Sequence, residues 1–464
     1  MNKVITSILK EGERLGSSYT EARYEKAVSQ GFLLKNSIPE ISACTEREGV
    51  GIRMMVAGKL CFCSTDTLTK ASLFRIMARA AKAAKASNLV TPSQSRLAVA
   101  KKRNAKVRIP AEGMTPEETL AYLTDLDRIA KPLSTRFFSL SSSETLKRVA
   151  TSEGTEIEST YPAISLFAMG TLGDGSMQRF WQKGSVGGRK EVKAWRMESM
   201  LSEDIAAMQR NVAKAEASPK GILDVVAAPE VTGILVHESG GHPYEADRIF
   251  GREGAQAGES FITPKVIGSR IAAPCITLVD DPTIEHSAGF YHFDDEGVKA
   301  RRKFLVKEGI ITELLHSRET AAHLKVQSNG SARAASFERE PIPRMSNTFI
   351  LPRDQGQEEL ISGVKRGVFI KSFMEWNIDD TRVNQKYVGS EAYLIEGGKL
   401  TVPLRQPVIE LTTQSLYGSI DAVGKDFQLF SGTCGKGEPM QGIPVSMGGP
   451  SIRLRGVRLG VRNG

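Results

Sequence analysis

The sequence predicts an α+β protein with two domains, an N-terminal mixed α/β domain over residues 1–218 and a mostly antiparallel β domain over residues 219–464. Three observations support this fold class. Strand and helix patterns alternate in the first half, hairpin signals recur in the second half, and 464 residues are too many for one ordinary hydrophobic core. Pro219 and Gly221 end a helical segment at about residues 197–217 and therefore mark the boundary between the domains.

The elements of the N-terminal domain follow from local patterns. Residues 1–16 are typical of a short amphipathic helix, and two apolar runs around a glycine-containing turn predict a hairpin over residues 49–65. Apolar residues at helical spacing predict a helix over residues 73–84. The capping box Thr115-Pro116-Glu117-Glu118 predicts the start of another helix. A further hairpin is expected to turn at Gly173-Asp174-Gly175.

The C-terminal domain is richer in strand signals. Residues 222–229 are typical of a short buried strand, and a helix is expected to begin near Pro229. Turns at Lys307-Glu308-Gly309 and at residues 396–399 predict hairpins. Between them, a helical pattern covers residues 358–369. These signals together predict a mostly antiparallel β domain.

Composition indicates the compartment. The chain is 40% hydrophobic and 25% charged, which is ordinary for a globular protein. Its apolar stretches are shorter than a membrane span, and its first residues lack the features of a secretory signal. Five cysteines are an odd, sparse set that suits a reducing compartment, and Cys61 and Cys63 on a predicted strand are interpreted as packing residues. We therefore expect a cytoplasmic protein without membrane association.

The basic balance of the chain does not by itself predict a nucleic-acid partner. The formal net charge is +9, and the densest basic cluster, residues 101–106, lies in a predicted linker. The C-terminal RLRGVRLGVR run alternates basic with apolar or glycine residues, as a half-exposed strand does. Neither cluster accompanies a nucleic-acid-binding motif or an aromatic stacking platform. Solvated surface is the better interpretation, and no nucleic acid is expected.

The histidines point to a candidate metal site. All six lie between His237 and His323, inside the predicted β domain, and two of them form an H-E-x-x-x-H arrangement, His237-Glu238-Ser239-Gly240-Gly241-His242. Neutral imidazoles are good ligands for Zn²⁺, and a carboxylate next to a ligand can reach the metal-bound water. Glu238 is therefore the candidate general base that activates this water.

The spacing of the two histidines conflicts with a regular helix. Residues five apart are about 140° apart around an α-helix, so the two rings would point away from each other. Gly240 and Gly241 allow the backbone to leave helical geometry, and Pro243 biases His242 away from the α region. We therefore predict that the helix breaks at Gly240-Gly241 and that His242 turns back towards the metal.

A catalytic zinc usually has three protein ligands, so the motif needs one more. Cys434 lies in a glycine-dense segment predicted to be a loop with an accessible sulfur, and Lys436 nearby would favour the thiolate. Glu245 and Asp247 are also candidates for orienting a histidine ring, against simple capping or surface roles. The residues alone leave the third ligand open among His286, His292, His316, His323, Glu245, Asp247, Cys275 and Cys434.

The segment HESGGHPYEAD at residues 237–247 resembles the metal-binding segment of the TldD/PmbA peptidases, specifically the TldD-type subunit. The similarity covers nearly the whole chain. Further segments resemble the family in order: residues 48–56, 270–281, 293–298, 329–349, 390–400 and 432–454. The resemblance implies a Zn²⁺ ion held by His237, His242 and Cys434, with Glu238 as general base.

The resemblance also implies a function and partners. It indicates a zinc-dependent peptidase that hydrolyses short or unfolded peptides, bound as an added β-strand, and that pairs with a TldE/PmbA-type subunit or with a second copy of itself. Arg333 and Asn347 are considered as residues of the peptide channel. The alternative is a non-catalytic binding or scaffold subunit of such a complex, against which the intact set of His237, Glu238, His242 and Cys434 argues.

Overall fold

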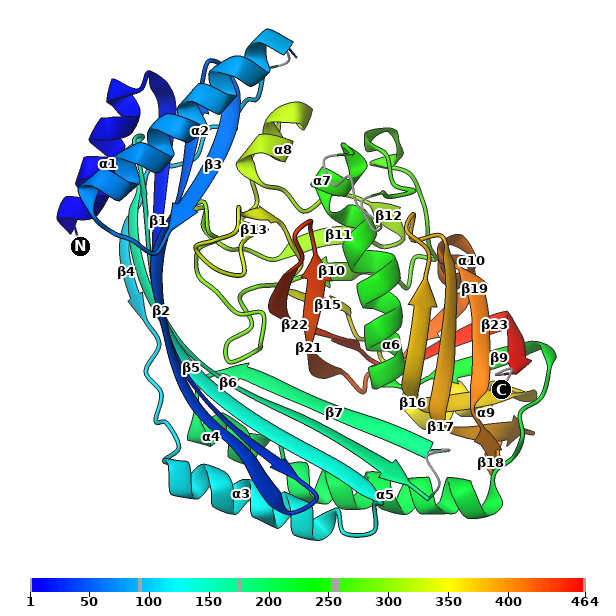
Figure 1. The fold of residues 1–464 in the computed structure, drawn as a ribbon. Coiled ribbons are helices and arrows are strands. Elements are labelled where there is room, and N and C mark those ends of the chain that lie inside the picture. Colours follow the sequence, from blue (N-terminus) through cyan, green and yellow to red (C-terminus); the bar gives the residue numbers. More distant parts are fainter. Residues whose placement is uncertain (1, 91–93, 174–176, 252–258, 462–464) are drawn as a thin grey trace.

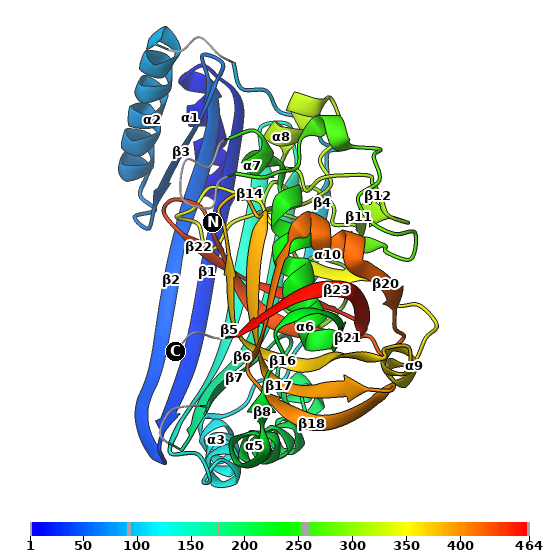
Figure 2. The ribbon, with the colours of Figure 1, turned by 90° about the vertical axis from the view of Figure 1, so that its right-hand side faces the viewer.

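The computed structural model describes residues 2–90, 94–173, 177–251 and 259–461. The N-terminal half forms one long, strongly curved sheet, and the C-terminal half lies on the concave side of this sheet (Figure 1). Seen after a 90° turn, strands β1 and β2 run along most of the height of the molecule beside the C-terminal half (Figure 2). None of the helices within the described ranges is both long and apolar enough to cross a membrane.

The N-terminal sheet has the strand order β3-β2-β1-β5-β6, and both β4 and β7 pair with β6. All of these pairs are antiparallel except β4 with β6. β6 ends at Leu172 and β7 begins at Met177, and the turn predicted at Gly173–Gly175 falls partly on residues 174–176, outside the described residues. The strands are β1 (Ser17–Lys35), β2 (Ile38–Val56), β3 (Lys59–Thr65), β4 (Asn104–Arg108), β5 (Thr135–Thr151), β6 (Glu156–Leu172) and β7 (Met177–Val186).

Helices cover the convex face of this sheet in two groups (Figure 1). One core lies under α1 and α2 and includes Cys61 and Cys63, which confirms their packing role. A second core lies under α3, α4 and α5. The capping box is confirmed, because the Thr115 hydroxyl accepts from the Glu118 N–H and the Glu118 carboxylate accepts from the Thr115 N–H. The helices are α1 (Asn2–Arg14), α2 (Lys70–Val90), α3 (Pro116–Ile129), α4 (Arg189–Ala194) and α5 (Met197–Lys214).

Two sheets and a central helix form the C-terminal half. Helix α6 (Pro229–Val236) begins at the predicted proline and packs between the sheets. One sheet has the order β12-β11-β10-β15-β22-β21, and the other β16-β9-β23-β19-β17-β18-β8, with β20 beside β23. The pairs are antiparallel except β15–β22, β16–β9 and β18–β8, which confirms the mostly antiparallel β prediction.

The bounds of these strands are β8 (Glu216–Ala217), β9 (Gly221–Ala227), β10 (Leu278–Asp280), β11 (Lys303–Lys307), β12 (Ile310–Ile311), β15 (Asn347–Ile350), β16 (Arg366–Ile378), β17 (Asn384–Glu396), β18 (Lys399–Arg405), β19 (Pro407–Thr412), β20 (Ile420–Val423), β21 (Gln428–Lys436), β22 (Gln441–Gly449) and β23 (Ile452–Val461). A small hairpin, β13 (Ala332–Arg333) with β14 (Ile342–Pro343), and the helices α7 (Ala246–Ile249), α8 (Arg318–Leu324), α9 (Gln357–Ser362) and α10 (Thr413–Ser419) complete this half. Both predicted hairpins are confirmed, as β11–β12 and β17–β18.

Two local predictions are wrong. The helix expected over residues 358–369 ends at Ser362, and strand β16 begins at Arg366. The run Val368, Phe369 and Ile370 is a buried central strand, and a short apolar run of this kind does not distinguish strand from helix by its period. The basic segment 101–106 is only partly a linker, because Asn104 begins the edge strand β4.

Buried ion pairs connect the two halves. Arg53 of β2 is almost completely buried and pairs with Glu21 of its own sheet and with Glu296 of the C-terminal half. Lys147 of β5 pairs with Asp295 at 3.0 Å. Glu296 and Asp295 lie in the acidic turn at residues 293–298, so this turn attaches the C-terminal half to the concave face of the sheet.

Candidate metal centre

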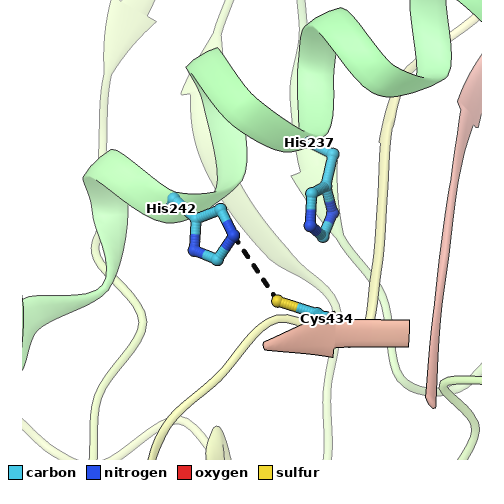
Figure 3. A group of neighbouring side chains, drawn as sticks. All are labelled: His237, His242 and Cys434. Atoms are coloured by element: carbon cyan, nitrogen blue, oxygen red, sulfur yellow. Dashed lines mark hydrogen bonds between the residues drawn. The ribbon is translucent and has the colours of Figure 1, made fainter. Parts of the chain in front are cut away.

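The structure brings His237, His242 and Cys434 together. Their ligand atoms all lie within 4.8 Å of one another, and all three side chains are buried. The Cys434 Sγ atom is 3.5 Å from the Nε2 atom of His242, and the two imidazole rings are 4.9 Å apart between centroids (Figure 3). The histidines follow helix α6, whereas Cys434 lies 192 residues from His242 in strand β21.

The predicted break of the helix at Gly240-Gly241 is wrong. Helix α6 continues into a π-helical turn over His237–Gly241, and the His242 N–H donates to the carbonyl of His237. An i→i+5 hydrogen bond places one more residue in the turn than the α-helical i→i+4 bond. Residues five apart therefore share a face here, as residues four apart do in an α-helix. The backbone stays right-handed at His242, with φ −53° and ψ −42°.

The two glycines act through close packing. A Cβ atom on Gly241 would lie 1.8 Å from the Met345 Sδ atom, and one on Gly240 would lie 2.5 Å from Leu278 Cδ2. Met345 and Leu278 are completely buried in the core of the C-terminal half. The turn that carries the histidines can therefore approach this core only because both positions lack a side chain.

Substituting Gly241→Ala should destabilise the protein. The added methyl group must displace Met345 from a packed core, which costs about 1–3 kcal/mol. Chemical denaturation monitored by circular dichroism measures the change in the free energy of unfolding. Gly418→Ala in helix α10 is the control, because its Cβ would meet nothing within 4 Å. A Gly241→Ala protein as stable as the unsubstituted chain would contradict the packing explanation.

The other candidate ligands lie outside this cluster. His286 contacts the Val186 carbonyl, His292 contacts Tyr161, His316 contacts Thr320 and His323 stacks on Phe250. Cys275 packs at the edge of the main core. In the part of the chain that the structure describes, His237, His242 and Cys434 are the one group of three that could hold a metal ion.

The predicted surroundings of Cys434 need two corrections. Cys434 does not lie in a loop. It belongs to strand β21, where it pairs with Ile443, and it is only 3% exposed. Lys436 does not stabilise the thiolate, because its ammonium donates a hydrogen bond of 2.6 Å to the carboxylate of the buried Asp247. Burial raises the pKa of the Cys434 thiol, but the charges of His242 and Arg344 outweigh burial and lower this pKa to about 7. The group is therefore readily available as a thiolate ligand.

A buried carboxylate orients His242. The Oε2 atom of Glu245 lies 2.9 Å from the His242 Nδ1 atom and also accepts from Arg248 Nε at 2.9 Å. Burial raises the pKa of Glu245, but Lys436, His242 and Arg248 hold it well below its usual range. An ionised Glu245 holds the proton of His242 on Nδ1 and leaves Nε2 free to face Cys434. Asp247 is also buried, but it contacts Lys436 and not a histidine.

Substituting Glu245→Gln should weaken the binding of zinc by about 10–100-fold, the usual effect of removing such an orienting partner. The neutral amide loses the charge-assisted hydrogen bond to His242. Competition with a chromophoric chelator measures the affinity, and Glu285→Gln, an exposed position in the same half, controls for the change in net charge. Equal zinc affinity in the Glu245→Gln and unsubstituted proteins would contradict the orienting role.

The donor set fits a zinc ion. Two imidazoles and one thiolate are a three-residue set of the kind that catalytic zinc uses, with one position left for water or substrate. Burial lowers the pKa of His237, which favours the neutral form that binds metals. The Nδ1 atom of His237 is buried and has no hydrogen-bond partner among the described residues. A cation bound at the cluster would give this buried nitrogen a partner.

Glu238 lies beside the cluster and is held by an arginine. Its Oε2 atom accepts from Arg382 Nη1 at 2.6 Å. Burial raises the pKa of Glu238, but the charges of His242, His237 and Arg382 outweigh burial and lower it. Arg382 lies between β16 and β17, 144 residues from Glu238, so no local pattern pointed to it. Glu238 and Arg382 line a cavity of about 240 Å³, here called the metal cavity. His237, His242 and Cys434 line the same cavity.

A second cavity of about 490 Å³ adjoins the metal cavity. It lies between β5, β6 and β7 on one side and the C-terminal half on the other. The two cavities share the lining residues Gln182, Lys183, Ser431, Gly432 and Thr433. Arg333 lines the second cavity, as considered for the channel. The channel role considered for Asn347 is wrong, because it is fully buried and its amide donates to the Asp281 carbonyl.

Comparison with known proteins places the chain in a metallopeptidase family. The chain belongs to the PmbA/TldA metallopeptidase family: models of the family's domain 1, central domain and C-terminal domain match residues 20–84, 109–216 and 220–461. This confirms the TldD/PmbA resemblance seen in the sequence.

Relatives and solved structures agree with this assignment. A metalloprotease TldD homolog of Haemophilus influenzae is 30% identical, over 96% of this chain and 93% of its own. A zinc metalloprotease TldD homolog of Saccharolobus solfataricus is 25% identical, over 97% and 98%. Among solved structures, a Thermotoga maritima protein described as a candidate modulator of a DNA gyrase superposes with a TM-score of 0.79 at 16% identity, over 99% and 100%. TldE of Thermococcus kodakarensis gives 0.74 at 16% identity, over 98% and 99%. The two structures show a shared fold.

Proposed function

We propose that this chain is a zinc-dependent peptidase that hydrolyses short or unfolded peptides, with Glu238 as the general base. The observation that carries the proposal is that Glu238 lines the same cavity as the three clustered donors His237, His242 and Cys434. The choice of zinc rests on the histidine and cysteine donors and on the relative named a zinc metalloprotease. When bound, zinc would polarise the peptide carbonyl and lower the pKa of a water molecule, so that the water loses a proton more easily and becomes a better nucleophile.

The residues of the chain have separate roles in the proposed reaction. Arg382 holds the Oε2 atom of Glu238, and no described group hydrogen-bonds the other carboxylate oxygen, Oε1. Oε1 is therefore available to take a proton from the attacking water and to return it to the leaving amine. The Nε atom of Arg382 is buried without a described partner, which makes Arg382 the candidate to stabilise the negative charge on the carbonyl oxygen.

The walls of the cavities suit an extended peptide. Within the described residues, β7 pairs only with β6 and β21 pairs only with β22, so each strand has an edge outside its own sheet. These two strands contact each other, and the Ser431 hydroxyl donates to the Gln182 carbonyl. Both strands line the metal cavity and the second cavity. An extended peptide can form backbone hydrogen bonds with such edges, and these bonds do not depend on the peptide's side chains. Residues 219–464 would then form the catalytic domain and residues 1–218 a domain that supplies the wall carried by β7.

A TldE/PmbA-type subunit is the proposed partner, with a second copy of this chain as the alternative, and the cytoplasm is the proposed compartment. The likeness to a TldE structure supports a partner of the same fold. Such a partner would enclose the open side of the cavities and so restrict access to unfolded chains.

The test is peptidase activity as a function of metal. The purified chain, alone and mixed with a TldE-type subunit, is incubated with a pool of unstructured peptides, and products are identified by mass spectrometry. We expect cleavage that is lost after treatment with a chelator and restored by zinc. A zinc-loaded chain that cleaves nothing under either condition would contradict the proposal and favour the non-catalytic scaffold subunit.

A further inference from the structure

Lys183 of strand β7 lies where the metal cavity meets the second cavity. It is one of the five residues that line both cavities, and its Nζ atom lies 6.0 Å from the centre of the Phe430 ring. Its neighbours at this junction include neutral hydrogen-bonding side chains, those of Gln182, Ser431 and Thr433. A ligand that occupied both cavities would therefore contact Lys183.

The other charged residues that line the two cavities have partners. In the metal cavity, Arg179 pairs with Glu230, and Arg382 pairs with Glu238. In the second cavity, Lys147 lies 3.0 Å from Asp295 and 3.8 Å from Glu25. Asp294 accepts backbone N–H groups, and Arg333 donates to the carbonyls of Met345 and Pro444.

Lys183 differs from all of these residues. Across the described residues, no carboxylate lies within ion-pair distance of its ammonium, and no hydrogen-bond acceptor is found for it. The acids whose charges act on it, Glu230 and Asp204, both pair with Arg179. Burial lowers the pKa of Lys183, as expected for a cation in a cavity that lacks an anion of its own. A partly buried cation without a counter-ion is costly, and an anionic ligand would remove this cost.

We propose that Lys183 forms a subsite that binds a carboxylate of the peptide substrate, either an acidic side chain or the C-terminal carboxylate. The proposal rests on the proposed peptidase function, because it assumes that peptides occupy both cavities. A carboxylate at the junction would form an ion pair with Nζ, with Gln182 and Thr433 near enough to line the same space. The backbone edges of β7 and β21 would then bind any sequence, and Lys183 would add a preference at one position.

The test measures binding without requiring cleavage. N-acetylated decapeptides of uncharged sequence are titrated calorimetrically into the zinc-loaded Glu238→Gln protein, in which turnover is expected to be strongly slowed. One form has a free C-terminal carboxylate, a second set has an amidated C-terminus and one glutamate placed at each position in turn, and a third form is amidated with glutamine only. The measurement is repeated with Lys183→Met, with Lys183→Arg, and with Lys190→Met as an exposed control on α4.

We expect at least one carboxylate-bearing form to bind about tenfold more tightly than the neutral form, the size of one hydrogen bond to a charged group. Lys183→Met should remove this difference, whereas Lys183→Arg and Lys190→Met should preserve it. The form that shows the preference identifies the source of the carboxylate. Equal binding of all forms, no binding of any form, or a preference that survives in Lys183→Met would overturn the proposal. A chain that shows the preference but cleaves no peptide would contradict the peptidase function and leave the carboxylate subsite standing.

Discussion

Zinc content should fall from close to one ion per chain to a small fraction of that when Cys434 is replaced by serine, and peptidase activity should fall with it. The thiolate is one of three donors, and a neutral hydroxyl is a much weaker zinc ligand. Cys434 also comes from strand β21, whereas both histidines come from the turn after α6. Its loss leaves two ligands from a single segment, which are too few for a catalytic site. Elemental analysis of identically prepared proteins measures the metal.

The matched control is Cys275→Ser. Cys275 is a partly buried thiol in the same half of the chain, but it packs at the edge of the main core and lies outside the donor cluster. The Cys275→Ser protein should keep its zinc and its activity. If Cys434→Ser binds zinc as tightly as the unsubstituted chain, the ligand set His237, His242 and Cys434 is wrong.

Replacing Glu238 with glutamine should separate metal binding from catalysis. The side chain is not one of the three clustered donors, so zinc should be retained at close to one ion per chain. Glutamine cannot accept a proton, so kcat should fall by about 10²–10⁴-fold, the usual contribution of a general base. Steady-state kinetics on a peptide found by the zinc-dependence test measures the change.

Glu230→Gln is the control for this substitution. Glu230 lines the same cavity, but its carboxylate pairs with Arg179 and not with Arg382. We expect this variant to keep most of its activity. A Glu238→Gln enzyme with unchanged kcat would exclude Glu238 as the base, even if zinc binding were confirmed.

Local signals predicted most of the secondary structure. The capping box at Thr115 and the proline at Pro229 start helices where expected, and the glycine-containing turns close the expected hairpins. Each of these signals acts within a few residues, so it is visible in the sequence. The segment at residues 366–369 was misread because its apolar run fits either period, and only its pairing with β9 and β17 makes it a strand.

The π-helical turn could not be predicted in the same way. Whether the His242 N–H bonds to a carbonyl four or five residues back depends on what packs against the turn. Here Met345 packs against Gly241 and Leu278 packs against Gly240, and both come from segments far along the chain. The two glycines are visible in the sequence, but glycine can permit either an irregular backbone or a close contact, and the sequence does not distinguish the two.

The candidate site was predictable only in part. The motif gave His237, Glu238 and His242, whereas the place of Cys434 in the ligand set came from family resemblance. Arg382 and Arg344 were missed because they reach Glu238 and the Cys434 carbonyl from distant segments with no motif of their own. Lys436 was expected to favour the Cys434 thiolate because it is near in sequence, but its ammonium donates to the buried Asp247 carboxylate, which no sequence pattern indicates.

The ion pairs between the halves bear on how the chain could be divided. Separating the C-terminal half from the long sheet would leave Arg53 without Glu296 and Lys147 without Asp295. Arg53 would keep Glu21 and Lys147 would keep Glu25, so the C-terminal half is the part that would lose its counter-charges, at Glu296 and Asp295. The sheet also contributes β7 to the wall of both cavities. A fragment that begins at residue 219 would hold all three clustered donors and Glu238, yet it would lack the wall that β7 gives to both cavities. Under the proposed function, the catalytic unit would be the whole chain, and the proposed boundary near residue 218 would mark a change from one sheet to another within that unit.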